Sequence, residues 1–279
     1  MNRRTFLTAL AGAPALAALI AACGDSTKTG SKYSFPQVSD EVVLRIASEG
    51  GFVAPGTNFV ALPTLLISGD GKAFTPGIMT EQFPGPLMSP MFVQSISKAG
   101  IEKVLKLAND AGLLDGELDY SLPDGVGIAD APDTVVTITV NGKTHTHRAN
   151  ALGMDTTDGA KSTPTRENLN TFVNLLVGKL QEVGGAANVG EATTWVADTY
   201  RLQATPVDPT QWTDPSPTIA DWPSTTGLQL ADAAQCATLA GSKVGDLFLK
   251  ATQLTFFKEG ELVYQLAVVG ALPGDALCA

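Results

Sequence analysis

The sequence predicts an α+β fold, in which antiparallel β-hairpins pack with two main α-helices. Two segments, 98–111 and 164–183, have the apolar spacing of a helix. The clearest strand pair, 134–140 and 143–149, is joined by Asn141-Gly142, which is a strong hairpin signal. Because the strands come as neighbouring hairpins with helices between the groups, this order favours α+β over a parallel, doubly wound sheet.

The first strand is expected at 42–47, where VVLRIA is mostly apolar and β-branched. The glycine-rich stretch that follows, SEGGFVAPG, is typical of a loop. Asp70-Gly71 then separates two apolar runs, and this predicts a hairpin with strands near 62–68 and 72–75.

Each of the two helices has a capping residue in front of it. Ser97 can cap the helix at 98–111, and Thr163 can cap the one at 164–183. In both helices the apolar residues recur at intervals of three and four, so they lie on one face. We therefore expect both helices to be packed against the sheet.

The C-terminal third contains a proline-rich segment, 206–227, after a strand at 200–205. This segment is either a linker or an extended loop whose two tryptophans hold it to the body. We expect 42–205 to form the main domain and 228–279 to pack on it. The latter segment predicts a helix near 243–251 and a hairpin of strands 254–257 and 262–269.

Cys236 and Cys278 are an even pair that remains once Cys23 is set aside for lipidation, as argued below. In an exported protein such a pair most simply forms one disulfide. The chain-entropy relation gives it roughly 4 kcal/mol for a loop of about 43 residues. A metal or redox pair is the alternative, but it lacks a CxxC spacing. The expected disulfide clamps the C-terminal helix and hairpin.

The first residues have the pattern of an export signal. Arg3 and Arg4 precede an apolar run over 6–22, and this run ends in Ala21-Ala22-Cys23. Glycine and proline interrupt the run, so 1–22 predicts a cleaved signal peptide rather than a spanning helix. The ending resembles the lipobox of bacterial lipoproteins, whose cysteine receives lipid such as palmitate. An ordinary signal peptide with an incidental cysteine is the alternative.

The lipobox implies that Cys23 holds the protein at the extracytoplasmic face of the cell membrane. Asn2 to Leu7 also resembles a twin-arginine export signal, whose passengers fold before crossing. Residues 24–40 are rich in glycine, serine, threonine and lysine, so 23–41 is expected to be a flexible tether. As random coil it would span roughly 20–25 Å.

The charge of the mature chain excludes one class of partner. Removal of 1–22 takes away two arginines and no acid, which leaves 16 basic and 28 acidic side chains, a net charge of −12 (16 − 28). Such a body has no general attraction for nucleic acid or anionic headgroups. We therefore expect no nucleic-acid partner, and membrane attachment through the lipid alone.

Motifs for catalysis, cofactors and metals are incomplete. Ser95-Ile-Ser-Lys98 matches SxxK, but the KTG of such enzymes occurs only in the tether and Ser97 has a capping role. His145 and His147 lie on one face of a strand and could bind a metal, although a solvated strand face explains them better. Glycine-rich dinucleotide and phosphate motifs are also incomplete. We therefore assign no catalytic, cofactor or metal residue.

Two resemblances rest on segments spread over the chain. EGGFVAPG, LLISGDGKAF, AGIEKVLKLANDAGLL, DAPDTVVTITVNGKTHTH and ATQLTFF together resemble a family of bacterial secreted lipoproteins of uncharacterised function, which implies an envelope location. The GGF segment, Asp-Gly hairpin and following helix within 45–148 resemble emfourin-type protease-inhibitor domains. That second resemblance implies inhibition of proteases.

The preferred hypothesis is a non-catalytic envelope protein that binds an unknown protein or glycan. Its candidate contact region is the loop from Gly50 to Asn58, with Gly50, Gly51 and Phe52 at its start, because exposed glycine-rich loops often carry recognition. The loop could equally be a plain connection between strands. A protease inhibitor and a hydrolase that uses dispersed carboxylates are the alternatives.

Overall fold

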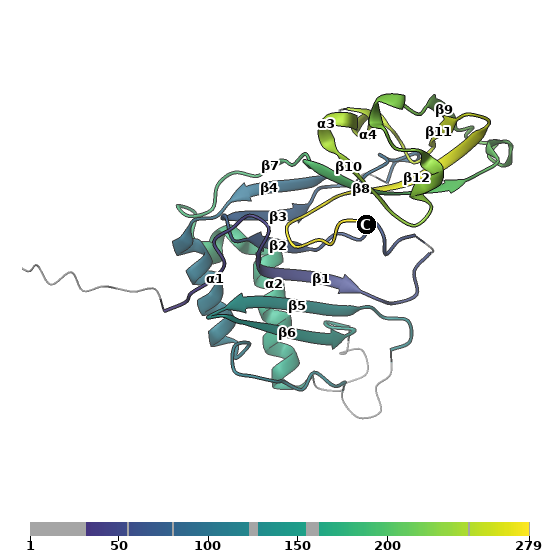
Figure 1. Ribbon diagram of the computed structural model, residues 1–279. Helices are drawn as coiled ribbons and strands as arrows, with labels where there is room; N and C mark the ends of the chain where they lie inside the picture. The colour runs from purple at the N-terminus through teal and green to yellow at the C-terminus, as the bar shows by residue number, and fades with distance from the viewer. Residues whose placement is uncertain are drawn as a thin grey trace, which may run out of the picture. The chain divides into compact units, whose positions relative to one another are not determined.

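The described part of residues 33–279 folds into two β-sheets and two long helices (Figure 1). Figure 1 is a computed structural model that describes residues 32–54, 56–79, 81–122, 128–154, 162–244 and 246–278. The predicted α+β class is confirmed. The signal region and Cys23 lie outside the described residues.

The larger sheet has the strand order β6-β5-β1-β2-β3-β4-β7, and all neighbouring strands are antiparallel. The hairpins predicted at Asp70-Gly71 and Asn141-Gly142 are present as β2–β3 and β5–β6. Gly71 and Gly142 have φ values of +80° and +73°, which glycine adopts without strain. The strands are β1 (Val42–Glu49), β2 (Leu65–Ser68), β3 (Lys72–Pro76), β4 (Met91–Ser95), β5 (Asp133–Val140), β6 (Lys143–Asn150) and β7 (Thr193–Thr194).

Helices α1 (Lys98–Asp110) and α2 (Pro164–Gly184) pack on one face of this sheet. Ser97 and Thr163 cap them as predicted, since each hydroxyl oxygen accepts a hydrogen bond from the amide three residues further on. Each fully buried aliphatic or phenylalanine side chain contributes roughly 1.5–3 kcal/mol to this core. The core includes Val43, Ile67, Ile101, Leu105, Val136, Ile138, Leu169, Phe172 and Leu176.

The smaller sheet has the strand order β10-β8-β12-β11-β9, in which only β9 runs parallel to its neighbour. Its strands are β8 (Thr199–Pro206), β9 (Thr218–Asp221), β10 (Ala237–Ala240), β11 (Thr255–Glu259) and β12 (Leu262–Gly270). Short helices lie beside them, namely η1 (Pro209–Gln211), η2 (Ser224–Thr226), η3 (Leu230–Ala233), α3 (Gly241–Val244) and α4 (Leu247–Lys250). A second core forms here around Tyr200, Leu202, Trp222, Phe248, Phe257 and Leu266.

The domain boundary expected after residue 205 is wrong. Strand β8 belongs to the smaller sheet, where it pairs with β12 and β10 from the C-terminal segment. The helix expected near 243–251 is also different, because two short helices, α3 and α4, occupy this region. The C-terminal segment therefore builds its own sheet together with β8.

Residues 206–227 were expected to be either a linker or a loop held to the body by two tryptophans, and the structure shows the second alternative. Trp222 is buried, and its indole Nε1 donates a hydrogen bond to the carbonyl oxygen of Leu228 at 2.8 Å. Trp212 packs edge-on against Phe256, with ring centres 5.0 Å apart. These contacts, and the pairing of β9 with β11, make the segment part of the folded body.

The tether expected at 23–41 is wrong at its C-terminal end. Tyr33 is only 7% exposed, and Phe35 packs against the larger core. Ser34 and Asn141 exchange two hydrogen bonds, from Ser34 N to Asn141 Oδ1 at 2.8 Å and from Asn141 N to Ser34 O at 2.6 Å. Because burial and hydrogen bonds fix these residues, the folded body begins at Tyr33.

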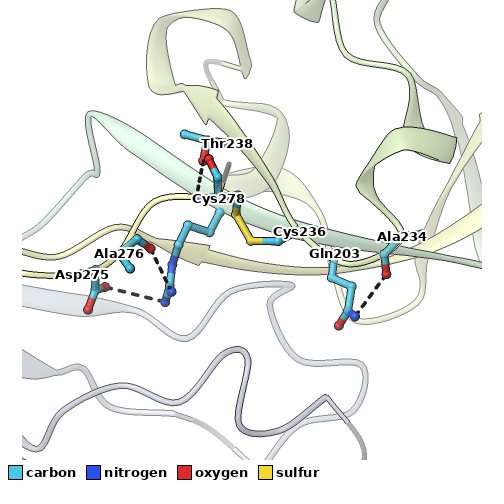
Figure 2. Close-up of a disulfide and its surroundings, with 8 residues drawn as sticks. Gln203, Ala234, Cys236, Thr238, Asp275, Ala276 and Cys278 are labelled. Carbon is cyan, nitrogen blue, oxygen red and sulfur yellow. Dashed lines mark hydrogen bonds and ion pairs between the residues drawn. A yellow bond between two sulfur atoms is a disulfide. The ribbon is translucent and has the colours of Figure 1, made fainter.

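The predicted disulfide between Cys236 and Cys278 is confirmed (Figure 2). Around it the last residues lie against the smaller sheet. The amide of Cys278 donates to Thr238 Oγ1 at 3.0 Å, and the guanidinium of Arg201 donates to Ala276 O at 3.5 Å. The disulfide therefore clamps the C-terminus onto β8 and β10.

Candidate functional site

A pocket of about 270 Å³ lies between elements of the two sheets. One wall comes from the connection between β3 and β4, and the other from β8, α4 and β12. Residues Val60 and Leu62, which follow the glycine-rich loop, complete it.

The first wall is the proline-rich connection between β3 and β4, residues 77–90. It is fixed to the smaller sheet's side by backbone hydrogen bonds, from Leu87 N to Ala251 O at 2.9 Å and from Gln253 N to Gly85 O at 2.9 Å. The side chain of Gln253 returns a bond, because its Oε1 accepts from Gly85 N at 3.2 Å. These bonds fix Gly85 and Leu87, so this part of the connection is held in place as a pocket wall.

Aromatic rings build the opposite wall. Trp195 packs edge-on against Phe74 at 5.5 Å between ring centres, and Tyr200 packs edge-on against Phe248 at the same distance. Gly270 lies under the indole of Trp195, where a Cβ would be 2.7 Å from a ring carbon. These edge-to-face contacts give the wall a fixed shape.

The pocket is chemically neutral. None of the nineteen lining residues in the described part of the chain carries a charge, although charged residues make up 16% of the sequence. Its polar side chains include Ser89, Thr194 and Gln253. Burial raises the pKa of the Tyr200 hydroxyl, so this group also stays neutral at physiological pH. The arrangement suits an uncharged, largely apolar ligand.

Exposed apolar side chains occur both in the pocket lining and elsewhere in the connection that forms one wall. Met79 and Leu249 line it and are 43% and 48% exposed. Ile78 and Phe83, from the same wall as Met79, are 84% and 63% exposed. We call Ile78, Met79, Phe83 and Leu249 the apolar rim. Exposed apolar side chains that form a contiguous patch mark contact with a partner or a membrane, and these four residues are candidates for such contact.

The predicted contact loop leads into this pocket. Gly50 and Gly51 have φ values of +72° and +78°, and the Phe52 side chain is 86% exposed. The loop continues through Phe59, whose ring lies 5.8 Å from the guanidinium carbon of Arg201, to the lining residues 60 and 62. Its role in partner contact stays a prediction, but its position joins it to the pocket.

The interpretation of His145 and His147 as a solvated strand face is wrong. Both face the core side of β6 and are 8% and 2% exposed. His147 contacts the hydroxyl of Tyr120 through Nδ1 and the carbonyl oxygen of Leu113 through Nε2, each at 2.8 Å. Nε2 must donate to the carbonyl, and because burial lowers the pKa of His147 the ring is neutral, so Nδ1 accepts from the tyrosine hydroxyl.

These histidines have a structural role. Burial lowers the pKa of both His145 and His147, and it raises the pKa of Tyr120 to about 12. Within the described residues no group of three or more His, Cys, Asp or Glu side chains is placed to hold a metal ion. His147 therefore serves to join β6 to the segment after α1.

A polar hollow near Arg148 is lined by the acidic residues Glu117, Asp119 and Asp133. Asp133 accepts hydrogen bonds from Arg148 and Asn150, and Asp119 accepts two from Ser121. These bonds lower the pKa of both carboxyl groups. A general acid needs the opposite shift, so neither group is set to donate a proton at neutral pH.

Comparison of the chain with protein-family models, curated proteins and solved structures found no significant match. The resemblances to secreted lipoproteins and to emfourin-type inhibitors stay predictions. Among the residues that Figure 1 describes, no helix is both long and apolar enough to cross a membrane.

Proposed function

We propose that this chain is a lipoprotein of the cell envelope that binds an uncharged apolar ligand in the pocket between its two sheets. The observation that carries the proposal is the neutral lining, which is bounded by fixed aromatic rings and by the methionine-containing wall. It refines the non-catalytic binding role expected from the sequence, and it favours an apolar ligand over a glycan.

The proposed membrane location rests on the lipobox-like ending at Cys23. The folded body begins at Tyr33, so nine residues, 24–32, separate it from the proposed lipid. Nine residues can span at most about 30 Å. Several acyl chains on one cysteine hold a protein firmly. The body would therefore stay close to the outer face of the membrane.

Labelled palmitate tests this location. Cells that express the full chain should incorporate the label into it. The Cys23→Ser variant should carry no label and should not be recovered in the membrane fraction. Unlabelled wild-type protein recovered from the cytosol would contradict the proposed anchor.

Binding is tested with N-phenyl-1-naphthylamine, an uncharged dye that becomes fluorescent in apolar surroundings. The protein is the chain that begins at Gly24, which keeps the whole folded body. Leu249→Glu places a carboxylate at the pocket and should weaken binding about tenfold or more, because an unpaired charge resists burial against an apolar ligand.

Leu262→Glu is the matched control. Leu262 is 53% exposed, close to the 48% of Leu249, but it does not line the pocket. Wild type and Leu262→Glu should bind the dye equally. Absence of dye binding to the wild type, or an equal loss in both variants, would refute the pocket as the binding site.

A further inference from the structure

The pocket can adapt its shape to a flexible ligand. Three of the five methionines of the chain, Met79, Met88 and Met91, line it. Methionine side chains are unbranched and polarisable, and they repack around apolar ligands of varied shape. The volume, about 270 Å³, lies just below the ~300–1,000 Å³ of pockets for drug-sized ligands. This volume holds part of one hydrocarbon chain and is too small for a whole lipid.

The apolar rim favours a ligand that comes from a membrane. Ile78 and Phe83 are 84% and 63% exposed, so in water they leave much apolar surface wet. At roughly 25 cal/mol per Å², contact with lipid tails would remove this cost. None of the lining residues described carries a positive charge, and the mature chain is acidic, so a headgroup with a net negative charge would be repelled. Uncharged or zwitterionic lipids fit these conditions, whereas anionic headgroups do not.

The length of chain before the folded body keeps the pocket near such lipids. The ten Cα–Cα steps from Cys23 to Tyr33 limit the distance between these two residues to about 35 Å, which is comparable to the thickness of the hydrocarbon core of a bilayer. A tether of this length holds the body at a high local concentration of lipid. The apolar side chains of a soluble partner would have no such advantage.

From the methionine lining, the apolar rim and the short tether, we infer that the pocket takes one acyl chain of an uncharged or zwitterionic lipid from the membrane that anchors the protein. The inference deepens the proposed function and rests on it. The rim guides the chain, Phe248 and Trp195 bound it, and the headgroup stays outside the neutral lining.

Transfer from vesicles tests this inference. Phosphatidylcholine vesicles are loaded with pyrene-acyl phosphatidylcholine dense enough to give excimer emission. The chain that begins at Gly24 should extract labelled lipid, which raises monomer emission in proportion to protein. Leu249→Glu should lower the extracted amount about tenfold or more, and Leu262→Glu should match the wild type.

A second pocket variant is needed as a control in case Leu249→Glu does not fold. Ser89→Trp adds an uncharged ring at an exposed lining position, so it should also block extraction. Circular dichroism must show that at least one of the two blocking variants keeps the wild-type melting temperature. Extraction that persists in a folded blocking variant would overturn the inference.

The dye and vesicle experiments separate the two proposals. Dye binding without lipid extraction would leave the pocket function standing and overturn the acyl-chain inference in favour of another apolar occupant, such as a side chain of a partner protein. Absence of both would remove both proposals. Dye binding and extraction that Leu249→Glu and Ser89→Trp abolish together would support both.

Discussion

Removal of the disulfide is expected to destabilise the smaller sheet substantially. The bond joins Cys236 to Cys278 across 42 positions. With a loop of about 43 residues, the chain-entropy relation gives an entropy loss of roughly 13 cal/mol/K in the unfolded state, or about 4 kcal/mol at 25 °C. The remaining polar contacts of the tail include the hydrogen bond from Cys278 N to Thr238 Oγ1 at 3.0 Å and the ion pair of Arg201 with Asp275 at 3.7 Å, and each contributes roughly 1 kcal/mol. They cannot replace the covalent bond.

Thermal unfolding followed by circular dichroism measures this loss. For a body of this size, 1 kcal/mol lowers the melting temperature by roughly 2–4 °C, so the double variant Cys236→Ser, Cys278→Ser should melt roughly 8–16 °C lower. The chain that begins at Gly24 has no other cysteine, so reductant should reproduce the shift and leave the double variant unchanged. A shift below about 2 °C would refute the clamp.

Three further outcomes are expected. Burial lowers the pKa of His147, so the unfolded state binds a proton at a higher pH than the folded state. The free energy of unfolding should therefore fall as the pH drops below about 6.5, by up to ~1.4 kcal/mol per pH unit. His147→Gln should reduce this slope, and an unchanged slope would contradict the buried neutral ring. Arg166→Met should cost about 2–4 kcal/mol by leaving buried carbonyl oxygens unpaired. Arg45→Met, at a partly exposed ion pair, should cost about 1 kcal/mol or less, and equal urea-unfolding midpoints of the two variants would refute this. In Gly270→Ala the new methyl group would lie 2.7 Å from a ring carbon of Trp195, so the ring should move and dye binding should weaken. In Gly178→Ala the new methyl group meets no atom within 4 Å, so this variant should bind the dye normally, and dye titration checks both variants.

Local signals allowed the helices and hairpins to be predicted closely. Asn141-Gly142 and Ser97 determine structure within a few residues, so their effects are readable in the sequence. The boundary after 205 failed because β8 finds its partners far along the chain, for example Leu202 opposite Val268. Such pairing depends on contacts that no local pattern records.

The face of His145 and His147 could have been predicted from the hairpin itself. A two-residue turn at Asn141-Gly142 sets Ile138 opposite His145 and Val136 opposite His147. Directly opposed residues in an antiparallel pair point to the same face. Because the two β5 residues are buried, the histidines opposite them also point into the core.

The pocket was missed because its wall has no regular pattern. The stretch PGIMTEQFPGPLMSPM alternates with neither the period of a strand nor that of a helix. Its meaning depends on contacts such as Gly85 with Gln253, 168 residues away. The local signal was the concentration of methionine and proline in the connection between β3 and β4. Exposed apolar side chains in such a segment indicate a contact surface.

Quenching of Trp195 by a brominated acyl chain tests the central claim most directly. Bromine quenches tryptophan only at close range, and Trp195 lines the pocket while Trp212 and Trp222 do not. Vesicles of dibromo-acyl phosphatidylcholine should quench the emission of the wild type and of Trp212→Phe, and this quenching should disappear in Trp195→Phe. Emission that stays unquenched, or quenching that survives in Trp195→Phe, would show that no acyl chain enters the pocket.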